Sequence, residues 1–576
     1  MELLTYSGLR KLWAVALVGA SVGMAPAALG QKARGAGQVV VAPKIDPRVA
    51  ARAQSQTPIR VFVVLADQPQ AGIFQQVEAA NALSRQIAES QYQRVAGQWF
   101  ASAAELSQAG AAVDAVVLQT RQQAFQAIEQ AIKPGQDAME SRLAGWGATH
   151  VLRYQGINML AAEIPASAIA RLEADPAVAE VFPVEVRYAD LATSVPALGA
   201  PTFWTAGYTG QGQSVGVLDT GARTNHPAFI GKSLISNVFL TTGSTDPCFA
   251  DNASSGEDEE GHGTHVTGIV MSQGSAGWTN YQGVAKGVDT LYSLKVGFNV
   301  STAGTCGGGG ESYDTDVIAG IDWAVKNTAL RVLNYSFGGP ASGDDDSLAR
   351  SIDQYVDTYG LTFAIAAGND GPSSRTVGSP GIAYNSITAA CWVSRGAIAG
   401  FSSRGPTNGG RYKPDLAAPG TYINSANYQW DASPGTGDDF ILMSGTSMAS
   451  PHLAGSAAVL RSAGITNALA VKAVLINTAD NTGWAADRGW GYTNLITADQ
   501  EMNYATGSLA ASGSQLYKIT PSGAAEATVT WNRHVSGSTS NFNDIDLYLF
   551  RADTGGALSS SATTLQDVEQ VSASYF

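Results

Sequence analysis

The sequence has little charge and few of the residues that mark several functional classes. Only 14% of its 576 residues are charged, three are cysteine and six are histidine. Lys and Arg number 34 against 48 Asp and Glu, and this formal net charge of −14 argues against nucleic acid as a partner. No run of about 18 uninterrupted apolar residues predicts a membrane-spanning helix. Hydrophobic residues make up 45% of the chain and 64 residues are glycine, which is typical of a large packed core with many tight turns.

An export signal is predicted at the N-terminus. Arg10 and Lys11 precede a short apolar run at residues 12–20, and small residues follow up to Gly30. This order is that of a signal peptide, and the apolar part is too short to favour spanning a bilayer. We therefore expect a signal peptide at 1–30, a linker at 31–54, and a secreted protein, extracellular or periplasmic, with no membrane in its mature form. The alternative is a buried N-terminal helix.

Ser447 is a candidate nucleophile. It lies between a flexible glycine, Gly445, and an apolar helical run. Small neighbours let a substrate backbone approach its hydroxyl, and a helix N-terminus supplies unpaired N–H donors. The same residues also suit an ordinary helix cap, so the interpretation depends on finding a base and an oxyanion donor elsewhere.

His262 is the candidate base among the six histidines. It lies between Gly261 and Gly263 at the start of a second apolar helix, where the helix dipole disfavours the imidazolium form. His265 is in the same turn but faces a different direction, and we expect it to be packed or capping. The spacing of the two histidines excludes a zinc-protease helix, which needs ligands at i and i+4 and an adjacent glutamate.

Two further polar side chains end predicted strands. The apolar run 214–218 stops at Asp219, before a turn glycine, and this carboxylate could orient the base. The apolar run 363–367 precedes Asn369, whose amide could donate to a developing oxyanion. Each is an ordinary turn residue when taken alone. The four segments together are far more specific than any one of them.

These segments resemble the motifs of subtilisin-like serine proteases, the subtilases. The chain order Asp219, His262, Ser447 is the order known from subtilisin. The resemblance implies an α/β fold, a subtilisin-like parallel sheet with helices on both faces. It also implies acyl transfer that requires no cofactor: Ser447 attacks the peptide carbonyl, His262 moves the proton, Asp219 orients the base, and the Asn369 amide holds the oxyanion.

The resemblance also implies where a protein or peptide substrate lies. Residues 334–339 are similar to the family's binding strand, so Ser336 and Gly338 would contact the main chain of an extended substrate. Gly378 matches the glycine at the floor of the main specificity pocket. No carboxylate falls in these stretches, and we expect a broad preference for apolar or aromatic residues at the cleavage position. Each glycine also suits a simple turn.

Residues 55–190 are expected to form a second unit. Strands near its two ends and a helix between the last two resemble the propeptide inhibitor domain of subtilases, an α+β ferredoxin-like fold. The Ala/Gln-rich stretch 71–145 has helical periodicity and predicts an insertion of one or two helices. The resemblance implies that this unit is an intramolecular inhibitor, whose tail within 185–193 blocks the active site and is cut by the enzyme itself.

A third unit is expected after a catalytic domain at 191–505. Alternating strand and turn signals over 506–576 resemble the small β-sandwich behind many bacterial subtilase domains, although too few strands pass to close it. Asp544 and Asp546 there are either calcium ligands or outward-facing strand residues.

The three cysteines allow one disulfide. Cys248 and Cys306 flank polar, glycine-rich loops and are expected to pair, whereas Cys391 lies in an apolar strand and is expected to be a buried thiol.

The metal content is left open. Many subtilases carry a calcium-binding carboxylate directly after the His226-Pro227 pair, but the residue here is Ala228, so that site is doubtful. The acidic run 257–260 has calcium-like charge, but we favour a solvated loop that complements the dipole of the next helix. A structural calcium ion elsewhere stays an open alternative.

The predicted function is a secreted serine endopeptidase made as an autoprocessed zymogen. A catalytically silent, subtilase-like binding protein is the alternative, but it would need a lost triad residue and none is lost. An acid protease with a carboxylate base is disfavoured by the Gly261-His262-Gly263 segment.

Overall fold

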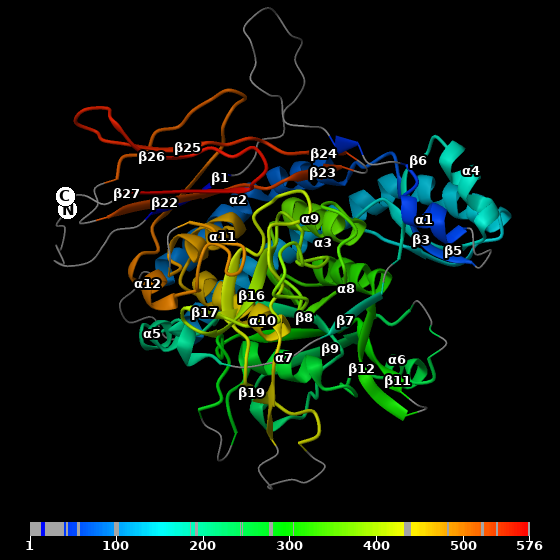
Figure 1. The fold of residues 1–576 in the computed structure, drawn as a ribbon, viewed down its shortest axis with the longest axis horizontal. Coiled ribbons are helices and arrows are strands. Elements are labelled where there is room, and N and C mark those ends of the chain that lie inside the picture. Colours follow the sequence, from blue (N-terminus) through cyan, green and yellow to red (C-terminus); the bar gives the residue numbers. More distant parts are fainter. Residues whose placement is uncertain are drawn as a thin grey trace, which may run out of the picture.

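The computed structural model describes residues 13–17, 40–41, 44–53, 58–96, 103–184, 186–189, 194–241, 244, 246–275, 280–302, 305–430, 439–480, 483–519, 524–536 and 539–573. A large central sheet, a smaller antiparallel sheet formed by earlier residues, and several small sheets near the C-terminus make up the molecule (Figure 1). Within the described residues, no helix has both the length and the apolar character needed to cross a bilayer.

The central sheet has eight strands in the order β17-β16-β15-β13-β8-β10-β9, with β18 also paired to β16. Every pair is parallel except β16 with β17. The strands are β8 (Ser214–Asp219), β9 (Ser233–Val238), β10 (Thr290–Lys295), β13 (Val332–Tyr335), β15 (Thr362–Ala366), β16 (Ile387–Ser394), β17 (Ala397–Ile398) and β18 (Leu416–Pro419).

Helices cover both faces of this sheet, and the predicted α/β fold is confirmed. Successive strand residues alternate between two cores: Val332 packs with one set of helices and Leu333 with the other. On the first face lie α7 (His262–Met271), α10 (Thr446–Ser462) and α11 (Ala468–Asn477), and on the second lie α8 (Asp314–Asn327) and α9 (Ser347–Tyr359).

The antiparallel sheet has the strand order β4-β5-β3-β6. Its strands are β3 (Ile59–Leu65), β4 (Thr149–Arg153), β5 (Met159–Ile164) and β6 (Val178–Pro183), with α1 (Pro47–Arg52), η2 (Ala166–Ala168) and α4 (Ile169–Ala174) beside them. Both faces of β3 are buried: Phe62 packs in the core that holds α8 and α9, and Val63 packs against this sheet's own helices. The antiparallel sheet therefore packs directly against the helices on the second face of the central sheet.

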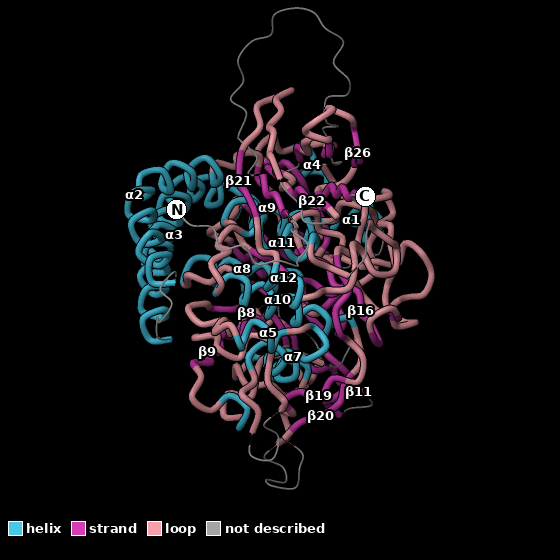
Figure 2. Tube along the Cα trace, turned by 90° about the vertical axis from the view of Figure 1, so that its left-hand side faces the viewer, coloured by secondary structure: helices cyan, strands magenta, loops and turns pink. Residues whose placement is uncertain are grey.

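Two long helices connect β3 to β4. The predicted helical insertion is confirmed as α2 (Gln70–Ala96) and α3 (Ala103–Gly145), which lie side by side along one flank of the molecule (Figure 2). At about 1.5 Å per residue, α3 is roughly 65 Å long. Together with α4 they give the β-α-β-β-α-β order of a ferredoxin-like fold, so the insertion enlarges the first crossover of this sheet.

The C-terminal strands form small sheets, as expected for an all-β unit. Trp13–Leu17, in the predicted signal peptide, forms β1 and pairs in parallel with β21 and β22. The rest of residues 1–30 lies outside the described residues. The C-terminal strands are β21 (Tyr504–Gly507), β22 (Ala525–Thr530), β23 (His534–Ser536), β24 (Thr539–Asn541), β25 (Leu547–Phe550), β26 (Ala557–Ser561) and β27 (Val568–Ala573). The short strand β2 (Val40–Val41), from the earlier part of the chain, pairs with β24.

The remaining elements surround the ends of the central sheet. They are β7 (Val186–Ala189), η3 (Pro196–Leu198), α5 (Ala200–Thr205), η4 (Pro227–Phe229), α6 (Phe249–Ala253), β11 (Gly297–Thr302), β12 (Thr305–Tyr313), β14 (Phe337–Gly338), β19 (Ile423–Ala426), β20 (Phe440–Met443) and α12 (Leu495–Gln500).

Candidate active site

Asp219 and His262 form a buried pair at the carboxyl end of the central sheet. Asp219 is the last residue of β8, and His262 is the first residue of α7. The Asp219 Oδ1 atom lies 2.6 Å from His262 Nδ1 and also accepts the Thr220 N–H at 2.9 Å. Burial raises the pKa of Asp219, and the interaction with His262 offsets only part of this rise. This arrangement holds the imidazole with Nδ1 toward the carboxylate and Nε2 on the opposite side of the ring.

The acidic run 257–260 before His262 is partly buried, and the expectation of a solvated loop is wrong for Asp258. Asp258 is fully buried: its Oδ1 accepts the Gly261 N–H at 2.8 Å, and its Oδ2 accepts the Thr264 N–H at 2.8 Å. Glu260 accepts the His262 N–H at 2.8 Å, and burial raises the pKa of Glu260 to about 7. These carboxylates satisfy the unpaired N–H groups at the start of α7, as the dipole argument expected.

Lys295 is a buried cation beside the pair that sequence reasoning missed. It ends β10 directly opposite Asp219 in the sheet register, and it is fully buried. Its Nζ donates to the Glu257 carbonyl at 2.6 Å and forms an ion pair with Glu259. A lysine that ends an apolar strand was the only signal in the sequence. The contact fixes the acidic loop to the sheet edge that carries Asp219.

Ser447 lies in the first turn of α10 and is nearly buried. Its Oγ donates to the Ser336 carbonyl at 2.7 Å, and the Ser336 Oγ donates to the Ser447 carbonyl at 2.7 Å. Ser336 directly follows β13, which is the neighbour of β8 in the sheet. The candidate nucleophile and the Asp219–His262 pair therefore lie at adjacent strand ends.

A series of buried side-chain hydrogen bonds supports Ser447. Ser450 Oγ donates to Asn334 Oδ1 at 2.7 Å, and Asn334 Nδ2 donates to Ser336 Oγ at 2.9 Å. Because Ser336 Oγ in turn donates to the Ser447 carbonyl, these hydrogen bonds tie the first turn of α10 to the end of β13. No motif signalled the role of Asn334, because one of its two partners, Ser450, comes from a helix more than 100 residues away.

Asn369 is oriented by the residue that precedes the candidate nucleophile. Its Oδ1 accepts the Thr446 N–H at 2.9 Å and the Thr446 hydroxyl at 3.2 Å. Gly368 before it has φ of 102°, a conformation that favours glycine. Because the amide oxygen is held in this way, its NH₂ group faces away from Thr446 and is available to an oxyanion.

A strand from the earlier part of the chain occupies the sheet edge beside this site. β7 pairs antiparallel with β12 on one side, Tyr188 opposite Glu311, and with β14 on the other, Tyr188 opposite Gly338. Ala189, the last described residue of β7, pairs with Phe337, whose ring centroid lies 5.2 Å from that of His262. The predicted binding residue Gly338 is thus paired with an extended strand, whose next residue pairs with the Phe337 that packs against His262.

Gly378 adjoins the same binding strand. The segment that carries it pairs with the strand through Ser379, which exchanges backbone hydrogen bonds with Gly339 at 2.8 and 2.9 Å. A Cβ at position 378 would lie 2.7 Å from the Gly339 carbonyl oxygen, so the backbones approach closely only without a side chain there. Gly378 therefore lies against the backbone of Gly339, the residue that directly follows β14.

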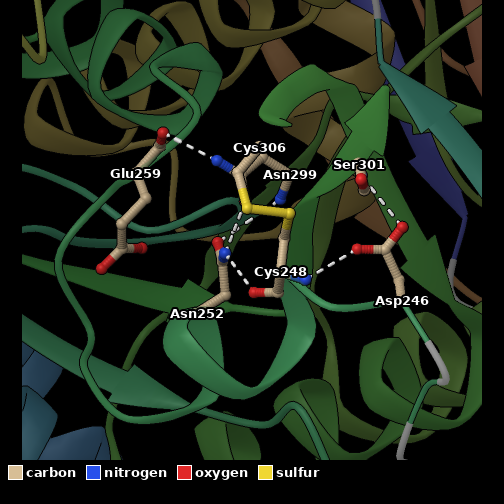
Figure 3. The surroundings of a disulfide bond; sticks show 7 residues. All are labelled: Asp246, Cys248, Asn252, Glu259, Asn299, Ser301 and Cys306. Carbon is tan, nitrogen blue, oxygen red and sulfur yellow. Dashed lines mark hydrogen bonds between the residues drawn. A yellow bond between two sulfur atoms is a disulfide. The ribbon is translucent and has the colours of Figure 1, made fainter. Parts of the chain in front are cut away.

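A disulfide fixes β12, the strand on the other side of β7. Cys248 and Cys306 are bonded, with Cα atoms 5.7 Å apart, and Cys306 belongs to β12. Beside it Asn252 donates to the Asn299 side chain at 2.5 Å, and Asn299 donates to the Glu259 carbonyl at 3.1 Å (Figure 3). The β11–β12 hairpin is therefore tied both to α6 and to the loop before His262. Cys391 is a buried thiol in β16, as expected.

Three other histidines are structural. His265 Nε2 lies within hydrogen-bonding distance of the Ile423 and Ile441 carbonyls, as expected for a packed residue. Burial lowers the pKa of His265 to about 3, and those of His226 and His452 to about 4. These side chains stay neutral at neutral pH, which leaves His262 as the candidate base.

Candidate metal positions are limited. Within the described ranges, no group of three or more His, Cys, Asp or Glu side chains could hold a metal ion. Ala228 is fully buried in η4, and Asp544 and Asp546 are exposed just before β25.

Comparison with known proteins gives one consistent result. The subtilase family model matches residues 210–492, the region that holds Asp219, His262, Asn369 and Ser447. Serine protease AprX of Bacillus subtilis is 32% identical over 334 residues, which cover 54% of this chain and 71% of the relative. Subtilisin E of Bacillus subtilis is 31% identical over 355 residues, 60% of this chain and 82% of the relative. An extracellular serine proteinase of a Thermus species is 32% identical over 364 residues, 58% of this chain and 76% of the relative.

Proposed function

The chain belongs to the subtilase family of serine proteases, and from this premise we propose that it is a secreted endopeptidase made as an autoprocessed zymogen. The observation that carries the proposal is β7. This strand follows the antiparallel sheet in the chain and lies between β12 and β14, and its Ala189 pairs with Phe337, whose ring packs against His262. Backbone pairing of this kind accepts many sequences, which suits a protease of broad specificity.

The proposed reaction begins with proton transfer. The Ser447 hydroxyl leaves the Ser336 carbonyl and gives its proton to His262 Nε2 as its oxygen attacks the scissile carbonyl. Asp219, bonded to Nδ1 at 2.6 Å, stabilises the imidazolium that forms. The oxyanion is held by the Ser447 N–H and the Asn369 NH₂ group. His262 then protonates the leaving amine, and water hydrolyses the acyl-enzyme by the reverse proton path.

The first substrate is proposed to be the chain itself. Residues 55–190 act as an inhibitory propeptide, and cleavage follows β7 within residues 190–193. The product strand then stays in the groove until the propeptide leaves. Because Gly338 and Gly378 leave the groove without side chains at two positions, we propose apolar or aromatic residues at the cleavage position of foreign substrates.

Export is proposed from the sequence pattern of residues 1–30. A disulfide fits an oxidising compartment, and one relative of 32% identity is described as extracellular. N-terminal sequencing of protein from the culture medium tests both cuts. A mature start just after 189 supports the proposal, and a start upstream of 150 refutes it.

Ser447→Ala in the full chain is the decisive variant for processing. We expect no peptide hydrolysis and an uncut precursor that retains β7, because no other group replaces the attacking oxygen. Ser456→Ala is the matched control, since it removes a buried hydroxyl of the same helix that donates to the His452 carbonyl within that helix at 2.7 Å. Normal processing in Ser447→Ala would overturn the assignment and would favour a catalytically silent binding protein.

A further inference from the structure

We propose that the α2–α3 hairpin is a second anchor of the propeptide, which keeps the cleaved propeptide bound by inserting Arg121 between the C-terminal ends of α8 and α9. The inference rests on the proposed autoprocessing. It goes beyond that proposal because it gives the enlarged crossover a role separate from that of β7. The hairpin packs on a surface of the catalytic domain. The residues of that surface that bind Arg121 are distant in sequence from the triad residues.

Arg121 is the centre of the anchor. The side chain is 1% exposed. Its guanidinium donates to the Leu330 carbonyl at 2.7 Å, the Tyr359 carbonyl at 3.1 Å and the Thr328 carbonyl at 3.4 Å. Thr328 caps α8 and Tyr359 ends α9, so the cation meets the negative ends of two helix dipoles. Arginine suits this position because its fork of N–H groups reaches several carbonyls at once.

Aromatic packing surrounds this contact. The Phe74 ring of α2 meets Tyr359 edge-on at 5.0 Å, and the Phe125 ring of α3 lies 5.6 Å from Tyr359. Both phenylalanines are buried in the same core as Tyr355 of α9. The guanidinium beside these rings is buried, and burial strengthens its hydrogen bonds.

The hairpin also touches the catalytic domain at its far end. Tyr92 of α2 donates its hydroxyl to the Ser462 carbonyl, the last residue of α10, at 3.2 Å. Gly110 of α3 approaches Gly212 so closely that a Cβ there would lie 3.1 Å from the Gly212 Cα. Figure 2 shows the two helices side by side on one flank of the molecule.

Packing along this seam is incomplete. Two cavities of about 130 and 290 Å³ lie between the hairpin and the catalytic domain, and Arg331 lines both. A few strong contacts beside unfilled cavities are typical of a contact surface that binds and later dissociates. A permanent protein core, in contrast, is packed with few voids. The propeptide is thus held at β7 and at Arg121, and two linked contacts raise the effective concentration of each.

The test measures release of the cleaved propeptide from the full-length product. Wild type, Arg121→Met and Arg94→Met are expressed as full chains, and the lag before peptide hydrolysis is recorded after dilution of the purified complexes. Size-exclusion chromatography records the fraction of propeptide that stays bound. Arg94 is the matched control because it is an exposed arginine of the same hairpin that donates to the Ser90 carbonyl of its own helix at 3.2 Å.

We expect normal cleavage after β7 in all three chains and a lag that is about 10 to 100 times shorter in Arg121→Met only, because three buried carbonyls lose their donor. An Arg121→Met lag equal to that of wild type would overturn the anchor while leaving autoprocessing intact. Absence of cleavage in wild type would instead reject the proposed function. If Arg121→Met yields no folded enzyme, Tyr92→Phe decides: a lag at least about twofold shorter supports the anchor, and an unchanged lag overturns it.

Discussion

Removal of the Cys248–Cys306 disulfide should reduce both stability and the binding of long substrates. The bond closes a loop of 58 residues in sequence separation. The chain-entropy relation for a loop of this length gives about 4 kcal/mol of stabilisation at 25 °C. The Asn252–Asn299 pair remains after the bond is lost and keeps part of the hairpin in place, so we expect a loss of about 2 to 4 kcal/mol in the free energy of unfolding.

The same change has a functional consequence that depends on substrate length. β12 pairs with the peptide positions occupied by residues 186–188, whereas β14 pairs with those of Tyr188 and Ala189. A loosened β12 should therefore raise KM for peptides that reach it by about tenfold, and leave kcat unchanged. A substrate with one residue before the scissile bond does not reach β12, and its KM should not change.

The assay compares the Cys248→Ser/Cys306→Ser chain with Cys391→Ala, which removes a buried thiol and keeps the disulfide. Unfolding by denaturant is measured in the Ser447→Ala background to avoid self-digestion, and KM is measured with one long and one short substrate. Equal changes in KM for both substrates, or no change in unfolding free energy, would refute the reasoning.

Three further changes test the site. Asn369→Ala should lower kcat by about 10² to 10³ with little change in KM, the loss established for the corresponding donor of a subtilisin, and a change in KM alone would contradict the oxyanion role. Asp219→Asn should lower kcat by about 10⁴, as in chymotrypsin-type triads, and a loss under tenfold would contradict its role in orienting His262. Burial lowers the pKa of His452 to about 4, so the unfolded chain alone binds this proton as pH falls from 6.5 to 4. In the Ser447→Ala background, His452→Gln should therefore make the acid loss of unfolding free energy shallower by up to about 1.4 kcal/mol per pH unit, and an unchanged slope would contradict the assignment.

The predicted fold and motifs depended on local patterns. The apolar run before Asp219 and the glycines around His262 are readable without a structure, because strand ends and helix starts have local signals. The α2–α3 hairpin was readable as helices for the same reason. Its place inside a ferredoxin-like unit was expected from the family resemblance, whereas the strand order of that sheet was not predicted, since it depends on pairing between strands far apart in sequence.

The residues that support the site were harder to predict. Asp258 reads as one acid in a polar run, and only the arrival of α7 against β8 buries it among N–H groups. Lys295 and Asn334 likewise gain partners from segments distant in the chain. A buried polar side chain cannot be recognised from the sequence until its hydrogen-bond partners are known. The residues that support the site are therefore identified only from the structure.

The most direct test of the central claim is labelling of the secreted, processed enzyme with a fluorophosphonate, followed by mapping of the modified residue by mass spectrometry. The account predicts one modified serine, Ser447, and parallel loss of peptide hydrolysis. Modification at another serine, or full hydrolysis with Ser447 modified, would contradict it.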